Sequence, residues 1–257
     1  MRRFVLPAVA VALCLASAAQ AFPLTLGAQL GSSVPDLRDD GGNELSTGYS
    51  SRFAPFAGAF AETPLSPAFS LRLELNLAPQ GGKRNGLQPV QDTSQFPVAP
   101  GTSLYANFDN QARLDYLEIP LLVGWHFGAG RRFAILGGPY AGILLSAKTV
   151  TSGTSTVYTD AQGTQPLSFP PGPPYDGAPF PAVDFGATTN DKSSLKTLNW
   201  GLQLGGQMAQ SMRGGDLSLS VRGGLGFTDI QRSADDGRNT TGVLVLALGY
   251  GWHTGDR

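Results

Sequence analysis

The chain has 257 residues, with 18 Lys or Arg against 19 Asp or Glu and a net charge of -1, so it offers no clustered basic surface for nucleic acid. Charged residues make up only 14% of the chain, below the roughly 25% of soluble domains, and 34 residues are glycine. This composition argues against an ordinary soluble enzyme and favours a membrane barrel of short alternating segments.

The first 21 residues read as a secretory signal peptide. Arg2 and Arg3 precede an apolar stretch at 4–16, and Ala19-Gln20-Ala21 forms a small-residue cleavage site. An uncleaved membrane anchor is the alternative, but the apolar run is short and no stop-transfer flank follows it. The single cysteine, Cys14, lies in this segment. The mature chain, 22–257, is therefore expected to form one barrel domain without a disulfide or a thiolate metal site.

Three segments of alternating polarity follow the signal peptide, and each predicts a strand. They are 22–32, 49–62 and 68–77, separated by a polar loop at 33–48 and a short turn at 63–67. The last is the clearest: Phe69 and four leucines face one way, while Ser70, Arg72, Glu74 and Asn76 face the other. A soluble sandwich with its leucines inward would show the same pattern.

A long loop is expected at 78–112, and two apolar runs within 114–148 then flank a tight turn at 128–132. Both runs have the roughly 9–11 residues that a tilted strand needs to cross a bilayer, and neither approaches a membrane helix of about 20 apolar residues. They predict a transmembrane β-hairpin. Pro120 and Pro139 interrupt it almost opposite one another, so we expect one shared defect in the ladder.

The longest connection, 149–193, includes a proline-rich stretch at 169–181 that cannot form a ladder because proline has no N–H to donate. A displayed binding surface and a mobile polar loop both fit this composition. Three further strands are predicted at 194–208, 216–228 and 240–252, joined by a short turn at 209–215 and a charged loop at 229–239.

These segments total eight strands, and their connections alternate long and short, with a last one of medium length. Outer-membrane barrels have an even strand number, short periplasmic turns and long extracellular loops. The sequence therefore predicts an all-β, eight-stranded antiparallel up-and-down transmembrane β-barrel with long extracellular loops, in the outer membrane of a Gram-negative cell.

Two sets of residues follow from this fold. Charged and amide side chains on the inward faces are expected to fill the lumen and to pair there, because a bilayer would not tolerate them outside; these are Arg72, Glu74, Glu118, Gln203 and Arg222. Aromatic residues near strand ends are expected to form the two interfacial girdles, with Tyr116 also near the outer rim; the girdle set is Trp125, Phe127, Trp200, Phe227, Tyr250 and Trp252.

The hairpin resembles a known family. The string Asp115-Tyr116-Leu117-Glu118-Ile119-Pro120-Leu121-Leu122, followed by Gly137-Gly138-Pro139-Tyr140, is similar to the barrel domain of PorT-family and porin-family outer-membrane proteins of Bacteroidetes. The resemblance implies the fold and the location, and it raises the possibility that the chain is a subunit of a secretion apparatus. Tyr250 and Trp252 are followed by five more residues, which departs from the aromatic terminus common in such barrels.

A barrel of eight strands has an interior that side chains just fill. We therefore expect a non-enzymatic protein that contacts outer-membrane lipids and displays loops 78–112 and 149–193 to surface or secretion-machinery partners, with no catalytic residue, cofactor or metal. The alternative is an enzyme acting on lipid A or phospholipid. Such an enzyme needs a nucleophile beside a base, and neither His126, which has no serine next to it in the hairpin, nor His253 in the tail shows this arrangement in the sequence.

Overall fold

The computed structural model describes residues 23–39, 41–44 and 46–254. The expected signal peptide at 1–21, with Cys14, lies outside the described residues and stays a prediction. Within the described part, no helix is long and apolar enough to cross a membrane. Its helical elements are three single turns of 3-10 helix: η1 (Ala129–Arg131), η2 (Lys192–Ser194) and η3 (Ala234–Asp236).

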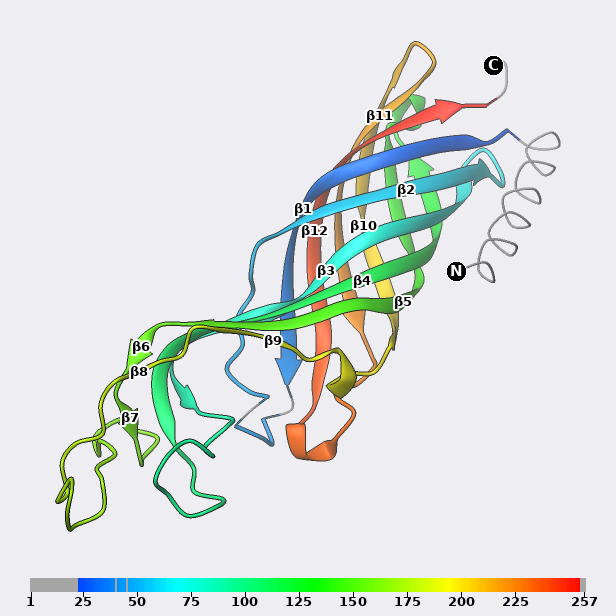
Figure 1. Ribbon diagram of the computed structural model, residues 1–257. Helices are drawn as coiled ribbons and strands as arrows, with labels where there is room; N and C mark the ends of the chain where they lie inside the picture. The colour runs from blue at the N-terminus through cyan, green and yellow to red at the C-terminus, as the bar shows by residue number, and fades with distance from the viewer. Residues whose placement is uncertain (1–22, 40, 45, 255–257) are drawn as a thin grey trace, which may run out of the picture.

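Eight long strands of the described chain form one antiparallel ring (Figure 1). They are β1 (Thr25–Asp39), β2 (Ala54–Pro64), β3 (Phe69–Pro89), β4 (Tyr105–Phe127), β5 (Phe133–Ser152), β10 (Leu198–Met212), β11 (Gly215–Gly226) and β12 (Asn239–His253). Each long strand pairs with the next along the chain. The last strand pairs with the first, from Thr25 opposite His253 to Asp39 opposite Asn239. This closure confirms the predicted up-and-down barrel and excludes a sandwich of two sheets.

The period-two pattern of the strands sorts their side chains between outside and inside, as predicted. On β3, Leu73, Leu75 and Leu77 are 40%, 49% and 55% exposed, whereas the intervening Arg72 and Glu74 are buried. The same alternation runs along β10, β11 and β12, where the leucines face outward. The outer wall is therefore apolar and the interior polar, the reverse of a soluble core.

The predicted order of long and short connections is confirmed. The short turns, 65–68, 128–132 and 213–214, lie at one end of the barrel, and the long connections, 40–53, 90–104, 153–197 and 227–238, lie at the other. We refer to these as the short-turn end and the long-loop end. The described chain also begins and finishes at the short-turn end, where Thr254 donates its N–H to Leu24 O at 2.9 Å.

Several strands are longer than the sequence predicted, and two loops are correspondingly shorter. Residues 78–89 and 105–112, expected in a loop, continue β3 and β4 as a ladder that runs to the pair Pro89 and Tyr105. Residues 149–152 belong to β5, and the long connection adds β6 (Thr154–Ser155), β7 (Val157–Tyr158), β8 (Val183–Asp184) and β9 (Ala187–Asn190). The expected loops 78–112 and 149–193 are thus partly sheet.

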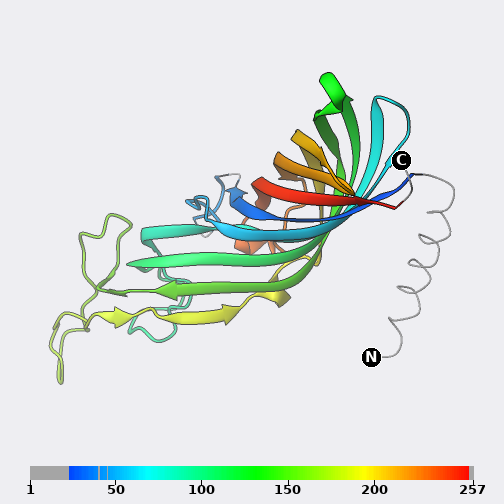
Figure 2. The same ribbon diagram turned by 90° about the horizontal axis from the view of Figure 1, so that it is seen from above.

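The extensions form an arm that projects from the long-loop end. We define the arm as residues 78–112 and 146–190; Figure 2 shows it as a curved sheet that continues one side of the ring. β2 pairs with β3 only as far as Leu77, so beyond this point β3 leaves the ring together with β4. Gly81, at a φ of +106°, lies where the strand leaves, and a Cβ there would collide with Ala112 O. Glycine permits this backbone conformation and close approach.

β1 also extends beyond the strand predicted at 22–32 and continues through Pro35 to Asp39. Pairing of β1 with β2 stops at Ser33 opposite Ala54, so Pro35 pairs only with β12. Proline is tolerated where one side of a strand has no ladder to complete. The sequence marked this segment as a loop because proline normally ends a strand.

The two prolines of the hairpin do interrupt the sheet. In the β4–β5 ladder the pairs Leu121–Pro139 and Leu122–Gly138 are missing, while Pro120 keeps its pair with Tyr140. The expectation of a single defect is wrong, because β3–β4 pairing also has a gap between Leu73–Leu121 and Asn76–Glu118. A strand residue directs its N–H toward only one neighbouring strand. The missing N–H of Pro120 therefore accounts for the gap toward β3, where Glu74 lies opposite, and that of Pro139 for the gap toward β4, where Leu121 lies opposite.

Candidate functional site

Glu74 is the centre of a polar network that fills the middle of the barrel. Its Oε1 lies 2.6 Å from Arg72 Nε, and its Oε2 lies 2.7 Å from Arg222 Nη1. β3 and β11, which carry Glu74 and Arg222, are directly opposite in the ring, because three strands separate them on either side. The contact between them therefore crosses the lumen. One carboxylate shared by two guanidinium groups gives strong charge-assisted hydrogen bonds.

Amide side chains complete this network. Gln29 on β1 donates through Nε2 to Glu74 Oε2 at 3.0 Å and to Asn76 Oδ1 at 2.9 Å, and its Oε1 accepts from Arg72 Nη2 at 3.1 Å. All of these side chains are buried. A Cβ on Gly58 would collide with Asn76 Oδ1, so this glycine leaves room for the amide. Sequence analysis did not name Gln29, although it stands on the polar face of its strand.

Glu118 lies apart from the arginines. Gln80 donates to its Oε1 at 2.8 Å and Gln203 donates to its Oε2 at 3.0 Å. Among the described residues, no ion pair joins Glu118 to a basic side chain, which differs from the pairing expected from its sequence pattern. Of the five residues predicted for the lumen, Arg72 and Arg222 therefore contact Glu74, whereas Glu118 and Gln203 form a second cluster.

An apolar layer closes the long-loop end of the barrel. We call it the seal, and its buried members are Leu37, Ala112, Leu114, Tyr116, Leu144, Ala147, Leu195 and Ile230, with Tyr49 packed against them. Leu195 and Ile230 come from two connections that fold over the mouth, joined by the bond from Lys196 N–H to Ile230 O at 2.8 Å. Tyr116 lies near the long-loop end, as expected, but its place among the girdle aromatics is wrong: its side chain is fully buried in the seal, on the same face of β4 as Glu118.

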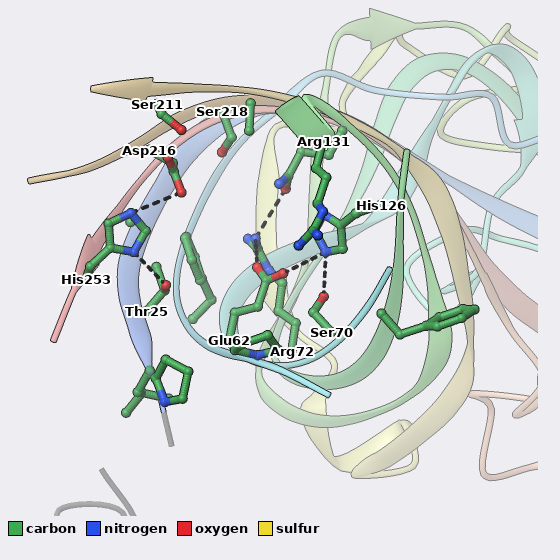
Figure 3. A pocket seen from close by; sticks show the side chains of 18 of the residues that line it. Thr25, Glu62, Ser70, Arg72, His126, Arg131, Ser211, Asp216, Ser218 and His253 are labelled. Atoms are coloured by element: carbon green, nitrogen blue, oxygen red, sulfur yellow. Dashed lines mark hydrogen bonds and ion pairs between the residues drawn. The ribbon is translucent and has the colours of Figure 1, made fainter. Parts of the chain in front are cut away.

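The short-turn end has an open cavity of about 540 Å³, which we call the vestibule (Figure 3). It is lined mainly by polar side chains from seven strands and by the η1 turn, and Arg72 and Glu62 are part of this lining. Arg72 Nη1 lies 3.3 Å from Glu62 Oε2, so the vestibule borders directly on the Glu74 network.

Both described histidines lie in the vestibule. His126 Nε2 lies 2.8 Å from Ser70 Oγ and 3.4 Å from Glu62 Oε1 (Figure 3). The sequence did not reveal this serine because it comes from the neighbouring strand. A general base that activates a hydroxyl needs one nitrogen toward the nucleophile and the other held by an orienting group. Here both partners share one nitrogen, so the arrangement does not provide that relay.

His253 instead binds one partner on each nitrogen. Its Nδ1 lies 3.1 Å from Thr25 Oγ1 and its Nε2 lies 3.2 Å from Asp216 Oδ2 (Figure 3). Thr25 and His253 are cross-strand partners at the junction of the first and last strands, and Asp216 comes from β11. The imidazole therefore links three strands where the ring closes.

The aromatic residues expected in girdles gather at the two ends of the outer wall. At the short-turn end, the Trp125 and Phe127 rings lie 5.2 Å apart and the Tyr250 and Trp252 rings 5.1 Å apart. At the long-loop end, the Trp200 and Phe227 rings lie 5.2 Å apart. Apart from Tyr250, which is half-buried, each of these side chains is at least 40% exposed.

The sequence matches the outer membrane protein beta-barrel domain over residues 18–232, most of the chain. The chain belongs to this family. It is accordingly an outer-membrane barrel protein, and the apolar outer wall faces lipid. No curated protein sequence matches the chain significantly.

Solved structures of outer-membrane barrels resemble this family member only distantly. The Ail protein of Yersinia pestis, in complex with the heparin analogue sucrose octasulfate, is 10% identical with a TM-score of 0.38, covering 90% of this chain and 99% of Ail. OprG of Pseudomonas aeruginosa is 12% identical with a TM-score of 0.36, covering 91% and 96%. Neisserial surface protein A is 11% identical with a TM-score of 0.34, covering 89% and 96%. Similarities this low do not transfer an activity to this chain.

Proposed function

We propose that this protein is a non-enzymatic outer-membrane anchor that holds the arm at the cell surface. The observation that carries the proposal is the Arg222–Glu74 contact, which spans the lumen at 2.7 Å. Together with the seal, it leaves the barrel without an open path, so transport of solutes is not its purpose. In this proposal the short turns face the periplasm and the arm faces outward, as in other outer-membrane barrels.

The arm is built to keep a defined shape at a distance from the membrane. It has its own small core, made of Phe96, Leu104, Val157 and Leu167. The proline-rich stretch packs on itself through ring contacts of Phe169 with Tyr175 at 4.2 Å and with Phe180 at 5.0 Å, and the Phe180 ring lies 5.6 Å from Phe96 of this core. This packing favours a displayed binding surface over a plain polar loop. Partners would meet the arm and its connections 90–104 and 153–197, while the leucine wall and the aromatic girdles contact membrane lipids.

Site-specific labelling in intact cells tests this orientation. The expected mature chain has no cysteine, so single cysteines introduced by Ala161→Cys on the arm and Ser66→Cys in a short turn report their own side of the membrane. Both positions are exposed. A membrane-impermeant maleimide should label the Ala161→Cys protein in intact cells, and the Ser66→Cys protein only after the outer membrane is permeabilised. The opposite pattern would overturn the proposal.

A second candidate function is hydrolysis of a lipid ester, because Thr25 Oγ1 lies 3.1 Å from His253 Nδ1 while Asp216 Oδ2 lies 3.2 Å from the other ring nitrogen. Refolded protein assayed with phospholipid and lipid A substrates separates the two functions. Hydrolysis that is lost in Thr25→Val or in Ser70→Ala, each of which removes a hydroxyl, would favour the enzyme; we expect no hydrolysis. A role in a secretion apparatus, which the resemblance to PorT-family proteins implies, stays a prediction.

A further inference from the structure

The arm carries a groove of about 250 Å³ on the face that continues the lumen side of β4. Phe108 and Asn110 of β4 line it, and Ala112, two residues further along the same face, already belongs to the seal. Phe108 stacks on Phe185 at 4.8 Å, and this pair forms an apolar wall. The rest of the lining is mainly polar. Its volume lies just below the roughly 300–1,000 Å³ typical of pockets for drug-sized ligands, so it suits a small ligand.

Asn110 is the feature that points to a ligand. Its side chain is only 8% exposed, it lines the groove, and its Oδ1 has no hydrogen-bond partner within the described structure. The same amide is hydrogen-bonded to the Tyr49 hydroxyl, which holds its orientation. A buried polar atom without a partner costs free energy unless something supplies the missing bond. A hydroxyl group can supply it, since it both donates and accepts.

The charges around the groove restrict the ligand further. Arg84 is the one basic residue of the described lining, against Asp92, Asp184 and Asp191. Arg84 donates one N–H, from Nη1, to Glu44 O at 2.7 Å and keeps its positive charge. Three carboxylates against one cation disfavour a sulfated or phosphorylated ligand and favour an uncharged or positively charged one.

We propose that this groove binds a sugar ring that bears free hydroxyl groups and, preferably, an amino group. The hydroxyls would pair with Asn110 and with Thr149 on β5, the amino group would lie near Asp184 and Asp191, and the Phe185 side would contact the apolar face of the ring. This inference rests on the proposed function, because it gives the displayed arm a ligand. The sugar could belong to the cell's own lipopolysaccharide or to a glycan from outside.

Calorimetry on the full chain refolded in lipid nanodiscs tests the inference, with chitosan trisaccharide as the probe and heparin hexasaccharide as the sulfated counterprobe. We expect saturable binding of the chitosan trisaccharide and at least tenfold weaker binding of heparin. Asn110→Leu should weaken binding of the chitosan trisaccharide about tenfold, the effect of losing one buried hydrogen bond. Asn107→Leu is the matched control, because Asn107 lies on the opposite, exposed face of the same strand, and it should change nothing.

A double variant, Asp184→Asn with Asp191→Asn, tests whether the two carboxylates recognise the amino group of the sugar, because it removes their charge and keeps the shape of the side chains. It should weaken binding of the amino sugar and leave binding of the uncharged N-acetylated trisaccharide as in the wild type. Competition by purified lipopolysaccharide would assign the groove to the cell's own surface, and displacement by external polysaccharide alone would assign it to another cell. Absence of trisaccharide binding, tighter binding of heparin, or an Asn110→Leu protein that binds normally would each overturn the inference. Cysteine labelling at Ala161 is measured separately, so a failure here is distinguishable from a failure of the anchor proposal.

Discussion

Arg222 of β11 and Glu74 of β3 meet across the full width of the barrel, with Nη1 and Oε2 2.7 Å apart. Glu74 also holds Arg72, so two buried guanidinium groups share one carboxylate. Removing one member of a buried pair is costly, because the partner's charge is left without compensation in an interior shielded from bulk water. The network therefore makes Glu74 the residue on which the interior depends most.

Glu74→Gln should destabilise the folded barrel strongly. The substitution keeps the shape of the side chain but leaves Arg222 buried without a carboxylate partner and Arg72 with only its longer contact to Glu62. We expect a loss of about 3–5 kcal/mol in the free energy of unfolding, the usual effect of breaking a buried ion pair from one side. Urea unfolding in lipid vesicles, followed by tryptophan fluorescence, measures it.

Glu118→Gln is the matched control for that experiment. Glu118 is as deeply buried as Glu74, yet its partners are the amides of Gln80 and Gln203 rather than arginines. The neutral side chain can keep one of these bonds and re-pair the other by rotation of an amide, so we expect a change below about 1 kcal/mol. Equal losses in the two variants would show that charge pairing does not explain the effect at Glu74.

Leu73→Arg tests the direction of the outer wall. Leu73 stands in the middle of the exposed apolar row of β3, between Phe69 and Leu77. A cation at the bilayer midplane of such a barrel costs about 2–4 kcal/mol, so the unfolding midpoint in vesicles should fall accordingly. Leu73→Phe, which keeps the position apolar, should leave it nearly unchanged. A stable arginine variant would mean that this face does not contact lipid.

Ile230→Ala probes the seal. Ile230 is 1% exposed and its backbone binds Lys196 and Asn239. Truncating a buried isoleucine costs about 2–5 kcal/mol. Here the loss should appear as faster hydrogen exchange at the amides of Lys196 and Ile230, because both lie in connections that pack on the seal over the mouth. Leu198→Ala, at an exposed position of the wall, should leave these amides protected.

The number of strands, their facing and the order of loops could be predicted from the sequence because they depend on local alternation. The leucines and polar residues of 68–77 have one arrangement that suits a membrane barrel, and the structure has it. The arm could not be predicted in this way. Residues 78–89 contain Pro79, Gly81 and Gly86, which are typical of loops, and they become a strand only through pairing with 105–116, beyond the connection 90–104.

The interior was predictable in kind but not in detail. Alternation indicates which residues point inward, and all five of the predicted lumen residues are buried. Which of them meet depends on the stagger of strands around the ring, which places Arg222 beside Glu74 and leaves Glu118 with glutamines. For the same reason, the contact between Ser70 and His126 could not be predicted from the sequence, since the two residues lie on neighbouring strands.

The central claim is that the barrel is a closed anchor and not a pore, and single-channel recording of the refolded protein in planar bilayers tests it most directly. Slower gel migration after heating than before would confirm that the inserted protein is folded. We expect the folded protein to produce no discrete current steps across the bilayer. Uniform, stable steps from the folded wild-type protein, absent when the heat-denatured sample is added, would contradict it.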